Sequence, residues 1–142
     1  MAEPELEVVI VSHGAGDLLM RCLESLRRYP PERGQRVTVV DSGSPDGTPD
    51  MVEQAFPEVR LLRRGNIGFS AANNVALREI EGPLVLLLNP DTEVYEGTID
   101  SSIARMESDA SIGMVGCRLV TESGELDHAC KRSFPTPLSA LA

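Results

Sequence analysis

Polar side chains that could do chemistry follow three apolar runs of the sequence. Ser12 closes the first run, Asp41 follows the second, and Asn89 and Asp91 follow the third, with Glu93 two positions further on. Carboxylates at such positions suit Mg²⁺ or Mn²⁺, which prefer oxygen ligands and often keep waters and substrate phosphates in their shell. A cation held by Asp91 would offset the repulsion between an acidic chain and a diphosphate, and it would stabilise charge that develops on a diphosphate leaving group.

Each of these residues also has a purely local explanation. The stretch Ser42 to Gly47 (SGSPDG) is rich in turn residues, so Asp41 could serve to open that loop, and Asp91 could likewise open a turn. His13 suits a loop histidine that makes a hydrogen bond. The segment Gly65 to Asn74 (GNIGFSAANN) could relieve strain at a helix start, or it could present backbone N–H groups to an anion or a sugar hydroxyl. The residue types alone leave these alternatives open.

Helices and strands alternate along the chain. Leu6 to Ser12 (LEVVIVS) predicts a strand buried on both faces, and Asp17 to Tyr29 has apolar residues at helical spacing with a proline after its end. We expect helices that begin at the caps Thr48 and Ser70 and a helix over Thr98 to Met106. Further strands are expected at Arg36 to Val40, Val59 to Leu62, Leu84 to Leu88 and Ile112 to Val120.

This alternation predicts an α/β fold with a doubly wound, mostly parallel sheet of strand order 3-2-1-4 and helices on both faces. A C-terminal β-hairpin is expected where Glu122 to Glu125 turns into Leu126 to Cys130. Such a sheet binds ligands beyond the carboxyl ends of its strands, where the winding reverses. In this strand order Ser12, Asp41 and Asp91 converge on one crevice.

The composition is that of one globular domain covering residues 1–142. The chain is 42% apolar and 25% charged with a formal net charge of −9, which suits a packed core and repels the phosphate backbone of nucleic acid. No apolar run approaches the ~18 residues of a membrane span, and the acidic start is unlike a secretory signal peptide. Cys22 and Cys117 fall in apolar elements, which predicts small core residues in a reducing compartment.

Other phosphate-binding classes fit the sequence less well. There is no G-x-G-x-x-G fingerprint after the first strand and no Walker A loop, which disfavours dinucleotide oxidoreductases and P-loop NTPases. A phosphoacceptor receiver domain would have an acidic pair where Ser12 and His13 stand. A nucleotidyltransferase would need a loop rich in glycine, arginine and lysine after the first strand. The stretch His13 to Arg21 (HGAGDLLMR) is a poor match, so this class is a weaker alternative.

Five motifs together resemble glycosyltransferase family 2, whose catalytic domain has the GT-A fold. They occur in the family's order and at its spacing, and as a set they are specific. The third and fifth motifs, with KRSFPTP near the end of the chain, are similar to the bacterial branch that makes cell-surface polysaccharides, including rhamnosyltransferases. The motifs are VVIVSHG (8–14), CLESL (22–26), VVDSGSPDGT (39–48), NIGFSAANN (66–74) and LLLNPDTEV (86–94).

The resemblance implies a role for each matched residue. Asp41 takes the place of the aspartate that contacts the nucleoside base, and Ser12 lies against the same nucleoside. Asn89 and Asp91 occupy the place of the family's D-x-D motif. Asp91 is then the carboxylate that holds Mg²⁺ or Mn²⁺, whereas Asn89, which replaces an aspartate, is expected to hydrogen-bond near the ribose. Asn73 lies in the segment that approaches the donor.

The resemblance further implies an inverting, metal-dependent hexosyltransferase of polysaccharide or cell wall biosynthesis. Its donor is a nucleoside-diphosphate sugar and its acceptor a saccharide or lipid-linked saccharide; no nucleic acid partner is expected. The implied location is cytoplasmic, at the inner face of the membrane if the full-length protein associates with it peripherally. In family members the base that deprotonates the acceptor hydroxyl comes later in the chain. We therefore expect an amino-terminal part that binds a donor but transfers poorly, and the alternative is a non-catalytic nucleotide-sugar-binding module.

Overall fold

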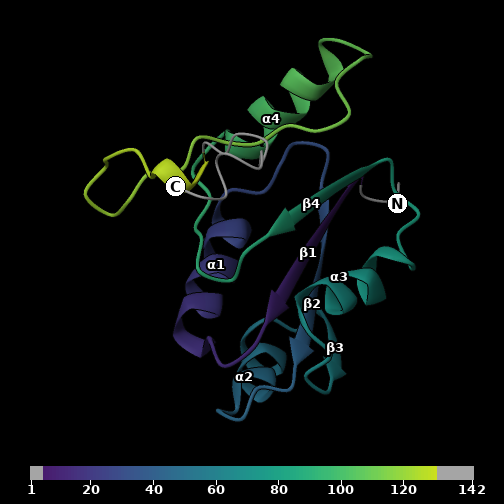
Figure 1. Ribbon diagram of the computed structural model, residues 1–142, viewed down its shortest axis with the longest axis vertical. Helices are drawn as coiled ribbons and strands as arrows, with labels where there is room; N and C mark the ends of the chain where they lie inside the picture. Colours follow the sequence, from purple (N-terminus) through teal and green to yellow (C-terminus); the bar gives the residue numbers. More distant parts are fainter. Residues whose placement is uncertain (1–4, 131–142) are drawn as a thin grey trace, which may run out of the picture. The chain divides into compact units, whose positions relative to one another are not determined.

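A run of β-branched residues forms the centre of a parallel sheet. In the computed structural model, which describes residues 5–130, β1 (Leu6–Ser12) is buried along its whole length. It pairs with β2 (Gln35–Ser42) on one side and β4 (Leu84–Leu88) on the other, and β3 (Arg60–Arg64) pairs with β2. All pairs are parallel and the order is β3-β2-β1-β4 (Figure 1). The predicted fold class and strand order are confirmed.

One face of this sheet packs on a helix of small residues. α3 (Phe69–Leu77) contacts β1 and β2. Its buried alanines Ala72 and Ala76 form a core cluster with Val9, Val11 and Val40. Since side chains alternate along a strand, every second residue of β1 and β2 points toward α3.

The other face is covered by two helices that contact each other, α1 (Gly16–Arg28) and α2 (Thr48–Ala55). α1 carries Asp17 in its first turn and two arginines in its last, which complements the helix dipole. Near the amino end of β2, side chains of α1, β2 and the segment after α2 line a hollow of about 370 Å³, among them Leu23, Val37 and Phe56. Ser12 and Asp41 lie at the opposite ends of their strands.

Glycine caps both helices for which a hydroxyl cap was predicted. Thr48 is the first residue of α2 and is buried, and the cap is Gly47 at φ 75°. Likewise α3 begins at Phe69 after Gly68 at φ 83°, so Ser70 lies inside the helix. Both glycines adopt a positive φ that other residues rarely tolerate, and this backbone requirement outweighs the preference for serine or threonine at the cap.

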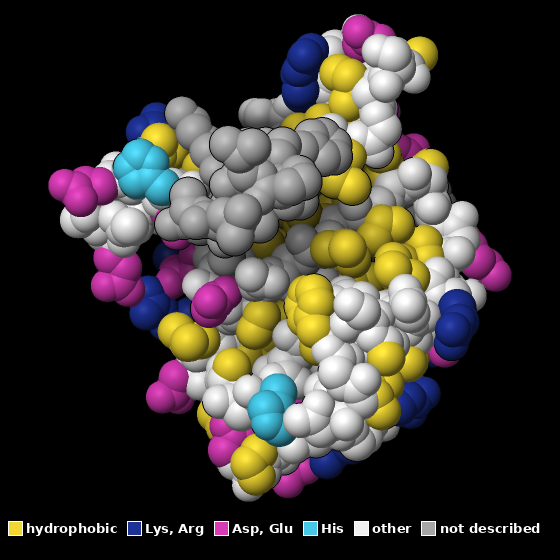
Figure 2. Space-filling model, in the orientation of Figure 1, with side chains coloured by type: hydrophobic (Ala, Val, Ile, Leu, Met, Phe, Trp, Pro, Cys, Tyr) yellow, Lys and Arg dark blue, Asp and Glu magenta, His cyan; other side chains and the backbone are white. Residues whose placement is uncertain are grey.

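β4 is an edge strand with one exposed apolar face. Val85 and Leu87 are 41% and 54% exposed. They register with Glu7 and Val9 of β1, which places them on the α3 face of the sheet. Figure 2 shows hydrophobic side chains gathered on the face where β4 lies in Figure 1. A run of five apolar residues is typical of a strand covered on both faces, but β4 alternates between half-buried and exposed residues.

The chain divides into two compact units, residues 1–99 and 100–142. The first contains the sheet, and the expectation of a single domain over 1–142 stays a prediction. α4 (Thr98–Glu107) begins at the end of the first unit and continues into the second. No helix among residues 5–130 is long and apolar enough to span a bilayer.

The fifth strand predicted at Ile112 to Val120 does not form. Val120 makes a single antiparallel bridge with Leu126, closed by a hydrogen bond from Thr121 N to Glu125 O at 2.9 Å. The expected C-terminal hairpin is reduced to this bridge, and a 3₁₀ turn (His128–Cys130) follows it. Gly113 and Gly116 interrupt the apolar run, and glycine within a strand weakens it. The prediction for Cys117 is also wrong, because this residue is exposed.

Candidate functional site

Ser12 and Asp41 lie side by side at the carboxyl edge of the sheet. They are register partners on β1 and β2, so their side chains are on the same face. Both residues are almost fully buried, at 1% and 4% exposure. Ser12 Oγ and Asp41 Oδ1 are nevertheless buried without a hydrogen-bond partner among the described residues. Buried polar atoms are almost always hydrogen-bonded, and leaving one unpaired costs about 1–3 kcal/mol. The pair therefore leaves two hydrogen-bonding oxygens unused among the described residues at this edge of the sheet.

The Asp41 carboxylate also organises the loop that follows it. Its Oδ2 accepts hydrogen bonds from the backbone N–H groups of Gly43 and Ser44, both at 3.2 Å. The local explanation of Asp41 as a turn residue is therefore correct, and it accounts for only one of the two oxygens. The turn fixes the carboxylate while Oδ1 stays unpaired.

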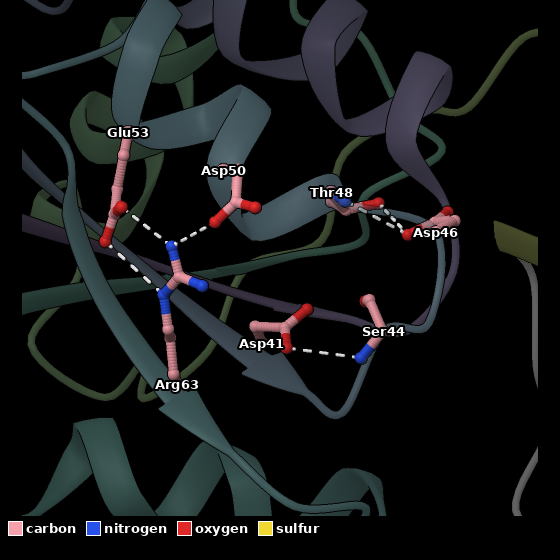
Figure 3. A network of polar contacts seen from close by, with 7 residues as sticks. All are labelled: Asp41, Ser44, Asp46, Thr48, Asp50, Glu53 and Arg63. Carbon is pink, nitrogen blue, oxygen red and sulfur yellow. Dashed lines mark hydrogen bonds and ion pairs between the residues drawn. The ribbon is translucent and has the colours of Figure 1, made fainter.

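The arginine that neighbours Asp41 in the sheet forms ion pairs with acidic residues of α2. Arg63 is the register partner of Asp41 on β3. Its guanidinium forms ion pairs at 2.7 Å with Asp50 and with Glu53, both on α2, as Figure 3 shows. The hydrogen bonds that the guanidinium donates to these two carboxylates raise the pKa of Arg63. The side chain is thus held against α2, away from the unpaired oxygen of Asp41.

The loop after β3 borders the same end of β2. Gly43 has φ +79°, and a Cβ on it would come within 3.0 Å of the backbone nitrogen of Asn66. Glycine is required here by both the backbone conformation and the close approach. The segment that begins at Asn66 therefore starts next to the turn formed by Asp41.

Asp91 lies in a tight turn directly after β4. Thr92 donates to the backbone oxygen of Asn89 from its N–H at 3.3 Å and from its hydroxyl at 2.7 Å. This confirms that Asp91 sits in a turn, with Pro90 preceding it. The Asp91 side chain is exposed, whereas Glu93 pairs with Arg21 at 2.5 Å. Asp41 is the last but one residue of β2, and Asp91 follows β4. Because all strands are parallel, both residues lie at the same edge of the sheet, on either side of β1.

The residues at this edge fit a divalent cation only as a partial ligand set. Among residues 5–130, no three His, Cys, Asp or Glu side chains come together as a ready-made metal cluster. Mg²⁺ in particular is commonly bound by one or two carboxylates, with waters and substrate phosphates completing its shell. A single exposed carboxylate at Asp91 fits that mode of binding and does not fit a closed, all-protein site.

Three other candidate residues, Asn73, Asn89 and His13, make hydrogen bonds within the chain. Asn73 is buried, and its Nδ2 donates to the backbone oxygen of Phe69 at 3.0 Å, so its amide nitrogen is used within α3. Asn89 contributes its backbone oxygen to the turn, and its proposed ribose contact stays a prediction. His13 Nδ1 donates to the backbone oxygen of Ser42 at 2.9 Å, which agrees with a loop histidine.

Sequence reasoning missed Ser42. This residue is 3% exposed and its Oγ has no partner in the described part of the chain. It follows Asp41 in β2 and therefore points to the α3 face. Its position at the end of β2 could have drawn attention to it, but the stretch SGSPDG reads first as a turn.

Cys22 is a buried structural thiol, as predicted. It lies in α1 with no exposed surface, and its Sγ donates weakly to the backbone oxygen of Asn89 at 3.7 Å. Burial, together with the charges of Asp91 and Glu93, raises the pKa of this thiol to about 12, although a hydrogen bond with Thr92 lowers it. The reactive thiolate is therefore scarce at neutral pH.

Alkylation should distinguish the buried Cys22 from the exposed Cys117. At pH 8, iodoacetamide is expected to label the exposed Cys117 and to leave Cys22 unlabelled until the protein is denatured, because Cys22 is both buried and protonated below its raised pKa. Peptide mass spectrometry after labelling for increasing times measures this. Labelling of Cys22 in the native protein at the rate of Cys117 would show that the α1 core is not packed as described.

Comparison with known proteins assigns most of the chain to one family. Residues 7–134 match Glycosyl transferase family 2. The chain is 38% identical over 108 residues to the N-acetylglucosaminyl-diphospho-decaprenol L-rhamnosyltransferase of Mycobacterium tuberculosis, an alignment that covers 68% of this chain and 35% of that protein.

Solved structures share the fold. S. aureus TarS 1-349 in complex with UDP-GlcNAc superposes with a TM-score of 0.62 at 25% identity, over 73% of this chain and 31% of that one. The mannosyltransferase PcManGT from Pyrobaculum calidifontis, in complex with GDP-Man and Mn²⁺, gives a TM-score of 0.67 at 24% identity, over 82% and 35% of the two chains. The present chain thus spans about a third of the length of these relatives. With the parallel sheet and the match over residues 7–134, the chain belongs to Glycosyl transferase family 2.

Proposed function

We propose that this chain binds the nucleotide portion of a nucleoside-diphosphate sugar at the carboxyl edge of β1 and β2. The observation that carries the proposal is the pair of buried, unpaired oxygens on Ser12 and Asp41. A carboxylate oxygen accepts the N–H of a nucleobase edge, and a serine hydroxyl can donate to a base carbonyl. The TarS relative, 25% identical, has been crystallised with UDP and with UDP-GlcNAc, which supports a nucleotide as the ligand class.

Asp91 would hold the cation that accompanies the diphosphate. In this proposal Asp91 would be the residue that holds Mg²⁺ or Mn²⁺, and the cation would stabilise the negative charge that develops on the departing nucleoside diphosphate. The acidic balance of the chain, a net charge of −9, makes such a cation useful because it screens the phosphates from the protein. Asn89, beside Asp91, is proposed to hydrogen-bond near the ribose, and Asn73 to border the donor.

The full-length protein would then transfer the sugar with inversion to a hydroxyl of a saccharide or lipid-linked saccharide. The mycobacterial relative is named for a lipid-linked acceptor, N-acetylglucosaminyl-diphospho-decaprenol, and we propose the same acceptor class here. A reaction on such an acceptor would take place at a membrane surface, on the cytoplasmic side in our proposal. Inverting transfer needs a base to deprotonate the acceptor hydroxyl, and we assign that role to none of the residues described here.

A thermal-shift panel tests the nucleotide site. UDP-, GDP- and dTDP-sugars are each added with and without Mn²⁺, and we expect one base class to raise the melting temperature, more so with Mn²⁺. A ligand present at 100 times its Kd stabilises the folded state by about 2.7 kcal/mol, which corresponds to several degrees for a chain of this size. Stabilisation by none of the donors would refute the proposal.

Product analysis then separates an enzyme from a binding module. Mass spectrometry after incubation with donor and a saccharide or lipid-linked saccharide acceptor detects transfer and, separately, donor hydrolysis. Metal-dependent binding with transfer supports the enzyme. Metal-dependent binding without either product supports a nucleotide-sugar-binding module for this chain.

A further inference from the structure

Two loops at the carboxyl edge of the sheet are fastened to each other by hydrogen bonds. One follows β1 and the other follows β2. His13 Nδ1 donates to the backbone oxygen of Ser42, and Gly14 N donates to Ser44 Oγ, both at 2.9 Å. Hydrogen bonds from the side chain and backbone of Thr48 hold the pKa of Asp46 below its ordinary value, and the backbone N–H of Gly16, which also donates to this carboxylate, adds a smaller contribution. The two loops thus form one hydrogen-bonded unit beside the proposed nucleotide site.

Ser44 connects the loop after β1 to Asp41 because it makes one hydrogen bond with each. Its hydroxyl accepts from Gly14 N at 2.9 Å, and its backbone N–H donates to Asp41 Oδ2 at 3.2 Å. Figure 3 shows the second contact, in which the Asp41 carboxylate faces the nitrogen of Ser44. The loop after β1 is therefore linked through a single residue to the carboxylate whose other oxygen is unpaired.

The segment that carries Ser44 depends on hydrogen bonds to hold its shape. Glycines with positive φ stand on both sides of it, Gly43 at φ 79° and Gly47 at φ 75°, and glycine has the largest conformational freedom of any residue. Ser44 itself is half-buried, between exposed neighbours. A hydrogen bond that pins such a loop before the ligand arrives raises affinity, because the ordering entropy is not lost on binding.

We propose that Ser44 is a positioning residue: its hydroxyl, by accepting the Gly14 N–H, fixes the orientation in which Asp41 presents its unpaired oxygen to the nucleobase. This inference rests on the function proposed above. Ser44 acts through Asp41 in this account and makes no contact with the nucleotide itself. Removing its hydroxyl should therefore matter only while Asp41 can still accept a hydrogen bond from the base.

A double-mutant cycle tests this dependence. Ser44→Ala and Asp41→Asn are made singly and together, and nucleotide affinity is measured by NMR titration with UDP, GDP or dTDP, according to which base class stabilises the wild-type chain. Ser44→Ala is expected to weaken binding about three- to tenfold in the wild-type background and less than about twofold in the Asp41→Asn background. Ser44→Thr, which keeps the hydroxyl, should bind like the wild type.

A surface control completes the design. Ser101→Ala changes an exposed serine of α4 and should leave affinity unchanged. An equal loss from Ser44→Ala in both backgrounds would overturn the proposal, since it would mean that Ser44 acts independently of Asp41. Wild-type affinity in Ser44→Ala would overturn it as well. If the wild-type chain binds none of the three nucleotides, the proposed function has failed instead, and the two failures are thereby distinguished.

Discussion

Replacing Asp41 by asparagine is expected to weaken nucleotide binding by roughly 10- to 150-fold, the equivalent of the about 1.5–3 kcal/mol contributed by a hydrogen bond to a charged group. Asparagine has the same shape, so its amide oxygen can still accept from the N–H groups of Gly43 and Ser44, which hold Asp41 Oδ2. The amide nitrogen then takes the place of Oδ1, and a base N–H would meet another donor there.

The same substitution should leave the fold as stable as before or make it more stable. Asp41 is 4% exposed and its Oδ1 has no partner among the described residues, so asparagine removes a buried charge that is only partly satisfied. Binding sites commonly retain such groups at the expense of stability. Isothermal titration with the nucleotide and thermal unfolding, performed on the same preparation, measure the two effects separately.

Asp50→Asn is the matched control. It removes an equal charge, but its carboxylate is exposed and pairs with Arg63 on the surface. Exposed ion pairs contribute about 0–1 kcal/mol, so a small loss of stability and an unchanged Kd are expected. Wild-type affinity in Asp41→Asn, or an equal loss of affinity in both variants, would show that Asp41 does not contact the nucleotide.

The sheet could be predicted from sequence because its signals are local and mutually consistent. The continuous apolar run of β1, the helical spacing of α1 and the proline after it each indicate one structure. Once strands and helices alternate, right-handed crossovers leave few strand orders. The placement of Ser12 beside Asp41, as register partners, follows from that order.

The predictions that were wrong concern segments whose structure depends on packing against other parts of the chain. The run Leu84 to Leu88 is fully apolar, yet two of its side chains are exposed because α3 packs on β1 and β2. The run Ile112 to Val120 has strand-like composition but forms only one bridge. Sequence patterns report what a segment can bury, and they do not report whether a neighbour is present to cover it.

The site could be predicted only in part, because some of its contacts join segments that are distant in the sequence. Turn chemistry explains why Asp41 binds the two N–H groups that follow it, and the parallel sheet explains why Asp91 lies at the same edge. The contact of Ser44 with Gly14 joins two loops 30 residues apart, and no spacing within SGSPDG indicates it. Nor could the unpaired state of Asp41 Oδ1 be inferred before the positions of Arg63 and α2 were known.

Asp91→Ala is expected to abolish the effect of Mn²⁺ on donor binding while leaving metal-free binding intact. In the wild type we expect Mn²⁺ to tighten the binding of a nucleoside diphosphate on the order of 10- to 100-fold, or about 1.4–2.8 kcal/mol, because a cation held by Asp91 would offset the negative charge of the phosphates. Titration with and without the metal gives the ratio of the two Kd values, which should fall to about one in the variant.

The nucleoside without phosphates makes this test specific to the role of Asp91. It should bind equally well to the wild type and to Asp91→Ala, with or without Mn²⁺, whereas Asp41→Asn should weaken both nucleoside and nucleotide. Glu93→Gln is the matched control, since Glu93 lies two residues away and its carboxylate is paired with Arg21. If Glu93→Gln rather than Asp91→Ala removes the metal effect, then the ion pair with Arg21 opens on binding and the cation lies at Glu93. We therefore expect Asp41 to control affinity for the base and Asp91 to control the dependence on metal. This result follows if a single nucleotide lies across the strand ends, because the two carboxylates are on either side of β1.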